Sequence, residues 1–105
     1  ALAGCAADPA PNEQMRLTEQ ALEQARAVGA NAEDIAELKQ AEDKVARASA
    51  EMTEGSYKDA RMLAEQAELD ARLAEARVLT LKSQEQLNVL NTRITRLRKQ
   101  LAEAQ

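Results

Sequence analysis

Residues 55–67 read "GSYKDARMLAEQA" and decide the fold, because a helix-ending glycine is followed at once by a helix start. Gly55 is expected to end one helix, since glycine tolerates the left-handed backbone of a tight turn. Ser56 with Asp59 three residues later approximates a capping box, with Asp in place of Glu. Tyr57 is expected to pack back on the preceding helix. The stretch therefore predicts an antiparallel helical hairpin that turns at Gly55 and Tyr57.

Outward from this turn, the chain divides into two shorter helices before it and one long helix after it. The first two are expected at about residues 13–28 and 32–54, capped by Asn12 and Asn31 and each followed by a glycine. No Gly or Pro occurs after Gly55. The third helix can therefore continue to about residue 103, a length of roughly 70 Å.

The composition supports the same fold class. Of 105 residues, 23 are Ala, and Tyr57 is the only aromatic residue. Strong helix formers dominate, while the β-branched and aromatic residues that favour sheets are scarce. We expect an all-α fold: an antiparallel hairpin or three-helix bundle whose long C-terminal helix extends as a coiled-coil arm.

The far end of the long helix carries a heptad pattern of apolar residues, which we call the leucine seam: Leu87, Leu90, Ile94, Leu97 and Leu101. Their spacing of 3, 4, 3 and 4 fills the a and d positions of a coiled coil. The same frame continues upstream through Leu69 and Leu73 but weakens at Thr80 and Ser83. We therefore predict a bundle at residues 12–82 and a coiled-coil arm at residues 83–105. The exposed seam predicts a protein partner or self-association.

Charge is distributed unevenly along the chain. Residues 1–76 contain 8 Lys and Arg against 16 Asp and Glu, whereas residues 77–105 contain 6 against 2. An acidic body with a basic end argues against nucleic-acid binding. The basic cluster Arg93, Arg96, Arg98 and Lys99 fits the solvated flank of a coiled coil best. Contact with an anionic surface is the second interpretation.

The first residues hold the only cysteine, Cys5, in the tetrapeptide "LAGC". Leu2, Ala3, Gly4 and Cys5 resemble a bacterial lipobox, where a signal peptidase cuts before cysteine and a diacylglyceryl group is attached to sulfur. The resemblance implies that residues 1–4 are a signal-peptide remnant. It also implies that Cys5 carries acyl chains such as palmitate, and that residues up to 11 form a flexible linker. A stray, unmodified cysteine is the alternative.

The layout as a whole is similar to the domain-of-unknown-function family DUF4398, whose members are short, Ala-rich helical envelope lipoproteins. The resemblance rests on the lipobox, on the hairpin "EMTEGSYKDARMLAEQAELDARLAEA" at 51–76 and on the long last helix. Ala6 and Ala7, rather than Asp, follow Cys5, and this implies the periplasmic face of the outer membrane. Some members are fused to a peptidoglycan-binding domain, which implies peptidoglycan-associated partners. The family brings no established activity.

The sequence contains few of the residues that enzymes use for catalysis. There is no His, and the single Cys is expected to be acylated. Gly4, Gly29 and Gly55 all have other expected roles, so no phosphate-binding loop is available. The carboxylates fall on solvated helix faces with Lys and Arg nearby. We expect no enzyme, no catalytic residue, no cofactor and no metal site.

The sequence favours a lipid-anchored periplasmic adaptor, attached to the membrane through Cys5, whose arm binds another copy or another envelope protein. Two alternatives remain open. One is an oligomeric spacer between outer membrane and cell wall, like murein lipoprotein, although that family ends in a lysine and this chain ends "LAEAQ". The other is a soluble helical interaction subunit without a lipid.

Overall fold

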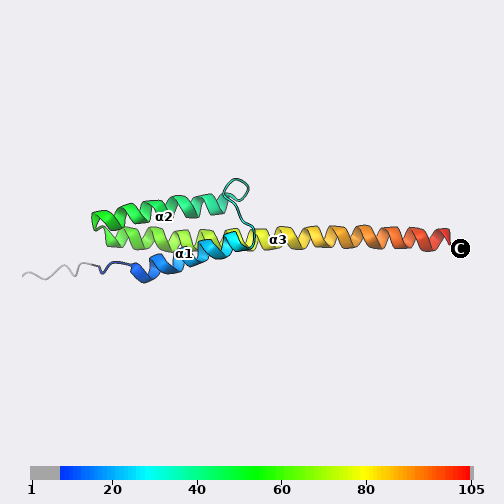
Figure 1. Cartoon of the computed structure of the whole chain (residues 1–105), viewed down its shortest axis with the longest axis horizontal. Helices are drawn as coiled ribbons and strands as arrows, with labels where there is room; N and C mark the ends of the chain where they lie inside the picture. Colours follow the sequence, from blue (N-terminus) through cyan, green and yellow to red (C-terminus); the bar gives the residue numbers. More distant parts are fainter. Residues whose placement is uncertain (1–7, 105) are drawn as a thin grey trace, which may run out of the picture.

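The chain folds into three helices in an up-down-up arrangement, seen in a computed structural model that describes residues 8–104. Helix α1 spans Asn12–Ala27, α2 spans Ala36–Glu54 and α3 spans Tyr57–Glu103. Helices α1 and α3 point the same way and α2 runs in the opposite direction (Figure 1). The predicted all-α fold with a long C-terminal helix is therefore confirmed.

Both connections begin at a glycine with a left-handed backbone, as predicted. Gly29 has φ 104° and Gly55 has φ 79°. After each glycine the next N–H bonds back to the helix it has left: Ala30 N to Ala25 O at 3.0 Å, and Ser56 N to Glu51 O at 2.8 Å. This six-to-one bond satisfies a carbonyl that the helix end leaves without an N–H partner. A side chain is strained at positive φ, so glycine fixes both turns.

The predicted N-caps differ from those observed. Asn12 is the first residue of α1 rather than its cap, and Ser56 precedes α3 without any capping hydrogen bond from its side chain. Asn31 does cap, but it caps a separate turn: its Oδ1 accepts from Glu33 N at 3.0 Å and Asp34 N at 2.9 Å. The chain then becomes extended at Ile35, whose side chain is buried. Helix α2 consequently begins four residues later than the expected start at residue 32.

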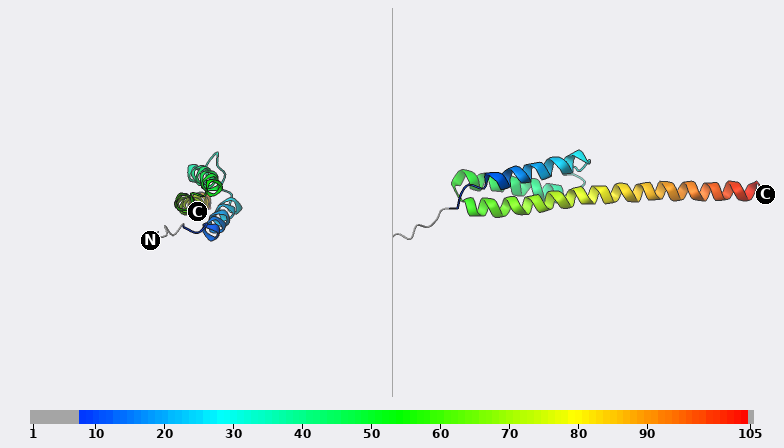
Figure 2. Two further views of the ribbon diagram at one scale, coloured as in Figure 1. Left: turned by 90° about the vertical axis from the view of Figure 1, so that its left-hand side faces the viewer. Right: turned by 90° about the horizontal axis from the view of Figure 1, so that it is seen from below.

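The first half of α3 packs on α1 and α2 through small side chains. We call this stripe the alanine face: Ala60, Ala64, Ala67, Ala71, Ala74 and Val78, all buried. Because alanine projects little from the helix, the backbones of neighbouring helices can approach closely. Seen end-on, the three helices form a triangle with α3 at one corner (Figure 2). The outward side of that corner is not covered by α1 or α2.

The core that α1 and α2 contribute is small. Its largest fully buried side chains are Leu22, Leu38 and Thr18. Ile35, just before α2, and Ala41 and Ala48 of α2 are also buried. Val45 is partly buried and packs against this core. The molecule measures 93 × 24 × 15 Å, since α3 continues far beyond this core. The bundle thus serves as a support from which one helix projects (Figure 1).

Candidate interaction surface

The arm is fully solvent-exposed in the part of the chain that the structure describes. Every residue from Leu79 to Ala104 is exposed, including all five members of the leucine seam. Leu90 is 51% exposed and Leu101 is 67% exposed. A contiguous row of large apolar side chains in water is typical of a binding surface.

Helix α3 carries a second exposed apolar patch over the bundle itself. We call it the outer face: Met62, Leu69 and Leu73. Leu69 is 63% exposed and Leu73 is 58% exposed. Each lies two residues after an alanine of the alanine face, Ala67 and Ala71, and therefore roughly 200° around the helix from it. The outer face is thus on the side of α3 opposite the hairpin, in the same heptad frame as the leucine seam.

This geometry revises how the first half of α3 was expected to pack. Leu69 and Leu73 continue the seam, but the bundle is held by a different stripe. The alanine face repeats at 4, 3, 4, 3 and 4 residues, which is as regular as the seam itself. That spacing would have identified the packing face from sequence, but its small residues give a weak hydrophobic signal.

Ion pairs between α2 and α3 hold the helical hairpin together within the bundle. Lys44 Nζ of α2 lies 2.7 Å from Asp70 Oδ2 of α3, with both side chains mostly buried. Arg77 Nη2 of α3 contacts Glu37 Oε1 of α2 at 2.5 Å. Both pairs join antiparallel helices at matching levels. They therefore resist sliding of α2 along α3.

A polar network joins α1 to α3. Gln14 Nε2 donates to Glu68 Oε1 at 2.8 Å and to Thr18 Oγ1 at 3.2 Å. The buried Thr18 hydroxyl lies 2.7 Å from the Ala64 carbonyl oxygen, to which it can donate. Arg72 Nη2 approaches Glu68 Oε2 at 2.7 Å. The hydrogen bonds from Gln14 and Arg72 lower the pKa of Glu68 below its usual value, although burial opposes them.

Lys82 makes the last contact between α3 and the shorter helices. Its Nζ donates to the Val28 carbonyl oxygen just beyond the end of α1. A cation at a helix C-terminus also interacts favourably with the helix dipole. Residues beyond Lys82 extend into solvent. The predicted division into a bundle and an arm at residues 82 and 83 stays a prediction.

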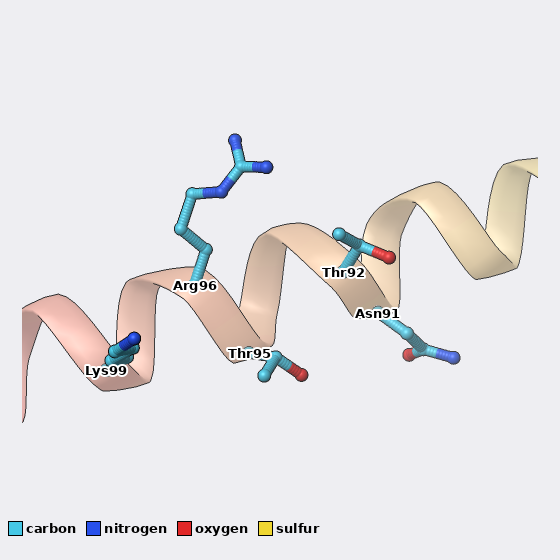
Figure 3. Close-up of a pocket in the computed structure, with 5 residues that line it drawn as sticks. All are labelled: Asn91, Thr92, Thr95, Arg96 and Lys99. Atoms are coloured by element: carbon cyan, nitrogen blue, oxygen red, sulfur yellow. The ribbon is translucent and has the colours of Figure 1, made fainter.

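Concave spots on the arm lie on one helix only. One is bordered by Asn91, Thr92, Thr95, Arg96 and Lys99, whose side chains diverge from the helix rather than converge on a point (Figure 3). A second runs beside Val89, Leu90 and Arg93. No other element within residues 8–104 closes either one. They are open grooves of a single helix surface and do not enclose a small molecule.

No group of three or more His, Cys, Asp or Glu side chains in residues 8–104 is arranged to hold a metal ion. No helix in that range is both long and apolar enough to cross a bilayer.

The predicted site residues fall in three places. The leucine seam lies on the exposed arm, and Gly55 with the half-buried Tyr57 lies at the hairpin turn, at the opposite end of the bundle. The lipobox residues Leu2, Ala3, Gly4 and Cys5 lie outside the described residues. The structure therefore brings none of these three groups together.

Comparison with known proteins identifies relatives of this arrangement. The profile of DUF4398, described as a domain of unknown function, matches residues 13–90. A crystal structure of a DUF4398 family protein from Pseudomonas aeruginosa is 67% identical to this chain. The match covers 92% of this chain and 100% of that one, with a TM-score of 0.87. No curated protein matches the chain.

Proposed function

The chain belongs to the DUF4398 family, and we propose that it acts as a lipid-anchored periplasmic adaptor at the inner face of the outer membrane. Cys5 attaches it to the bilayer, the three-helix bundle supports the arm, and the arm binds a helical partner. The partner is another copy of the chain or another envelope protein, with peptidoglycan-associated proteins among the candidates. The role is structural, and no residue is assigned to catalysis.

The observation that carries this proposal is the exposed leucine seam on a helix that projects beyond its own bundle. Apolar side chains of this size cost free energy in water, and their burial yields about 25 cal/mol per Å². The heptad spacing of the five seam residues matches the knobs-into-holes packing of a second helix. A partner helix is therefore the occupant that best fits the arm.

The anchor rests on the lipobox resemblance at Leu2–Cys5 and on where α1 begins. Asn12 lies at the end of the molecule opposite the tip of the arm (Figure 1). Asn12 comes seven positions after Cys5, a reach of at most roughly 25 Å. A lipid at Cys5 would hold the bundle near the bilayer, and the arm would be free to meet partners away from the attachment point.

The arm is tested with the paired substitutions Leu90→Asp and Leu97→Asp. We expect loss of self-association in sedimentation and loss of partners in a crosslinking pull-down from native membranes, because charges in the seam cannot be buried without cost. Val89→Asp is the matched control, since Val89 is also exposed on the arm but lies off the seam. Unchanged sedimentation and unchanged partner recovery in the double variant would refute the arm as a binding surface.

The anchor is tested by mass spectrometry of the mature native chain and by globomycin treatment of cells. We expect a diacylglyceryl-modified Cys5 and accumulation of an unprocessed precursor when the signal peptidase is inhibited. Cys5→Ser should move the protein out of the membrane fraction. A free thiol on Cys5, with no effect of globomycin, would overturn the lipoprotein assignment and favour the soluble interaction subunit.

A further inference from the structure

The outer face and the leucine seam form one continuous surface. From Met62 to Leu101, the a and d positions of a single heptad frame run along α3 on the side away from the hairpin. Large apolar residues occupy both ends of this stripe, and the small polar residues Thr80 and Ser83 occupy its middle. The stripe therefore extends over the bundle as well as the arm, and a partner can use its whole length.

We propose that this stripe is covered by a second copy of the chain in antiparallel orientation, so that the arm of each copy lies on the outer face of the other. The proposal rests on the self-association part of the proposed function and names its geometry. Its a and d layers come from α3, and α2 flanks them on one side, where Glu37 borders the same groove as Leu73 and Ala76.

Charge disfavours the parallel alternative, chiefly in the arm. In a parallel coiled coil, each g residue faces the e residue five positions later in the partner. Three g–e pairs along the stripe join like charges: Glu65 with Asp70, Arg72 with Arg77, and Arg93 with Arg98. Asp70, Arg72 and Arg77 already pair with Lys44, Glu68 and Glu37 of their own chain, so Arg93 with Arg98 is the pair in which neither charge has an ion-pair partner within residues 8–104. Each pair occurs twice in a symmetric dimer. Like-charge pairs of this kind select against a wrong alignment.

The antiparallel arrangement has a register that matches large side chains with large ones. An antiparallel pair alternates a residues with d residues of the partner. Centring the pair between Thr80 and Ser83 gives these layers: Met62 with Leu101, Leu69 with Ile94, Leu73 with Leu90, Ala76 with Leu87, and Thr80 with Ser83. Gln66 with Leu97 is the one layer that mixes a large polar with a large apolar side chain.

Charge also favours this register. The antiparallel register places the basic arm of one copy beside the acidic bundle of the other. Arg96 lies level with residue 67 of the second copy, on the flank that carries Glu65 and Glu68. At the g positions Arg93 lies opposite Arg72 of the second copy, and the charge of that Arg72 is compensated by Glu68 at 2.7 Å. Complementary potentials of this kind fix the orientation of a complex.

The first test separates the outer face from the arm. In the full chain with Cys5→Ser, we expect a dimer in sedimentation equilibrium. Leu69→Glu with Leu73→Glu should give a monomer, although the arm is untouched. Both residues are exposed in the single chain. The variant should therefore keep the helical content and the melting temperature of the monomeric chain. The control is Val89→Glu, which is similarly exposed but off the stripe, and it should remain dimeric.

The second test measures orientation with single cysteines in the Cys5→Ser chain. Leu73→Cys and Leu90→Cys lie in one layer of the proposed dimer. Mixing the two variants under mild oxidation should give a disulfide-linked dimer, whereas neither alone should. In the antiparallel pair, the two copies of residue 90 are about 26 Å apart along the axis. A disulfide formed by Leu90→Cys alone would show a parallel pair and overturn the proposal.

The remaining outcomes separate this inference from the proposed function. A Cys5→Ser chain that sediments as a monomer overturns the antiparallel dimer. The adaptor proposal would then depend on whether the crosslinking pull-down recovers another protein. If Leu90→Asp with Leu97→Asp loses a native partner while Leu69→Glu with Leu73→Glu keeps it, the arm binds another protein and the outer face has no part in it. Because these chains lack the thiol, failure of the lipid anchor does not affect the result.

Discussion

Glu68 is one of the residues of α3 whose polar contacts join it to α1. It accepts from Gln14 of α1 and from Arg72, one turn later in α3. Its side chain is 19% exposed, so these bonds are partly shielded from water. Hydrogen bonds to a carboxylate that favour its charged form lower its pKa, and the structure assigns that direction to Glu68.

This shift predicts how stability depends on pH. A carboxyl with a lowered pKa in the folded state stabilises the protein above the ordinary glutamate value of about 4.3, and the stabilisation is lost as the pH falls through the lowered value. Glu68→Gln should therefore lower the free energy of unfolding at neutral pH by about 1 kcal/mol. This loss should appear as a lower melting temperature. The substitution should also flatten the acid limb of a plot of melting temperature against pH. Glu65→Gln, one turn away and exposed, is the control; equal slopes in all three proteins would contradict the prediction.

Residue-level features differed in how far sequence could predict them. Gly29 and Gly55 were predicted as helix ends because positive φ is a property of the residue itself. Asn12 is the first residue of α1 and not its cap, so that prediction was wrong. Ser56 is the N-cap residue of α3 as predicted but its side chain makes no capping hydrogen bond, and Asn31 caps a turn rather than a helix. A polar side chain before a helix can bond several nearby N–H groups. Its choice depends on the path of the loop, which one residue does not encode.

Helix α3 combines two faces with opposite properties. The alanine face is small, buried and in contact with α1 and α2, and the outer face is large, apolar and exposed. Hydrophobicity gives more weight to leucine than to alanine. The sequence pattern therefore predicted the leucine seam but not the alanine face that packs on α1 and α2. Helix existence and length were predictable from composition and the absence of Gly and Pro after residue 55. Which face packs was decided by the close approach that alanine allows.

The alanine face predicts a strong dependence on side-chain size. Ala67 is fully buried at 0% exposure, and Ala67→Leu would need space that the close helix contact does not provide. We expect a loss of about 1–3 kcal/mol of unfolding free energy, measured by thermal or urea denaturation followed by circular dichroism. Ala46→Leu, on the exposed side of α2, makes the same chemical change and should stay within about 0.5 kcal/mol of the original. Equal stability of the two variants would mean that α3 does not pack through its alanines.

At the scale of the whole molecule, the position of the ends constrains the assembly. The start of α1 and the tip of the arm lie at opposite ends of a molecule 93 Å long (Figure 2). In the proposed antiparallel dimer, the two copies of Asn12 would therefore leave from opposite ends of the rod. Two lipid anchors on one membrane would then hold the rod along the bilayer surface. An upright spacer would instead need both anchors at the same end, which is a parallel arrangement.

Truncation tests whether bundle and arm are separate units. A chain ending at Lys82 keeps every member of the alanine face and the Lys82 contact to the Val28 carbonyl, but it lacks the leucine seam. We expect it to remain helical, to melt cooperatively and to sediment as a monomer. The reason is that residues 83–104 bury nothing within their own chain.

A second truncation ending at Arg77 also removes Val78 and Lys82, and it should melt at a lower temperature because one buried side chain and the cap on α1 are lost. If the chain ending at Lys82 is unfolded, the arm contributes to the stability of the bundle and the division into two units is wrong. If it still associates as strongly as the full chain, the seam is not the surface that joins the copies.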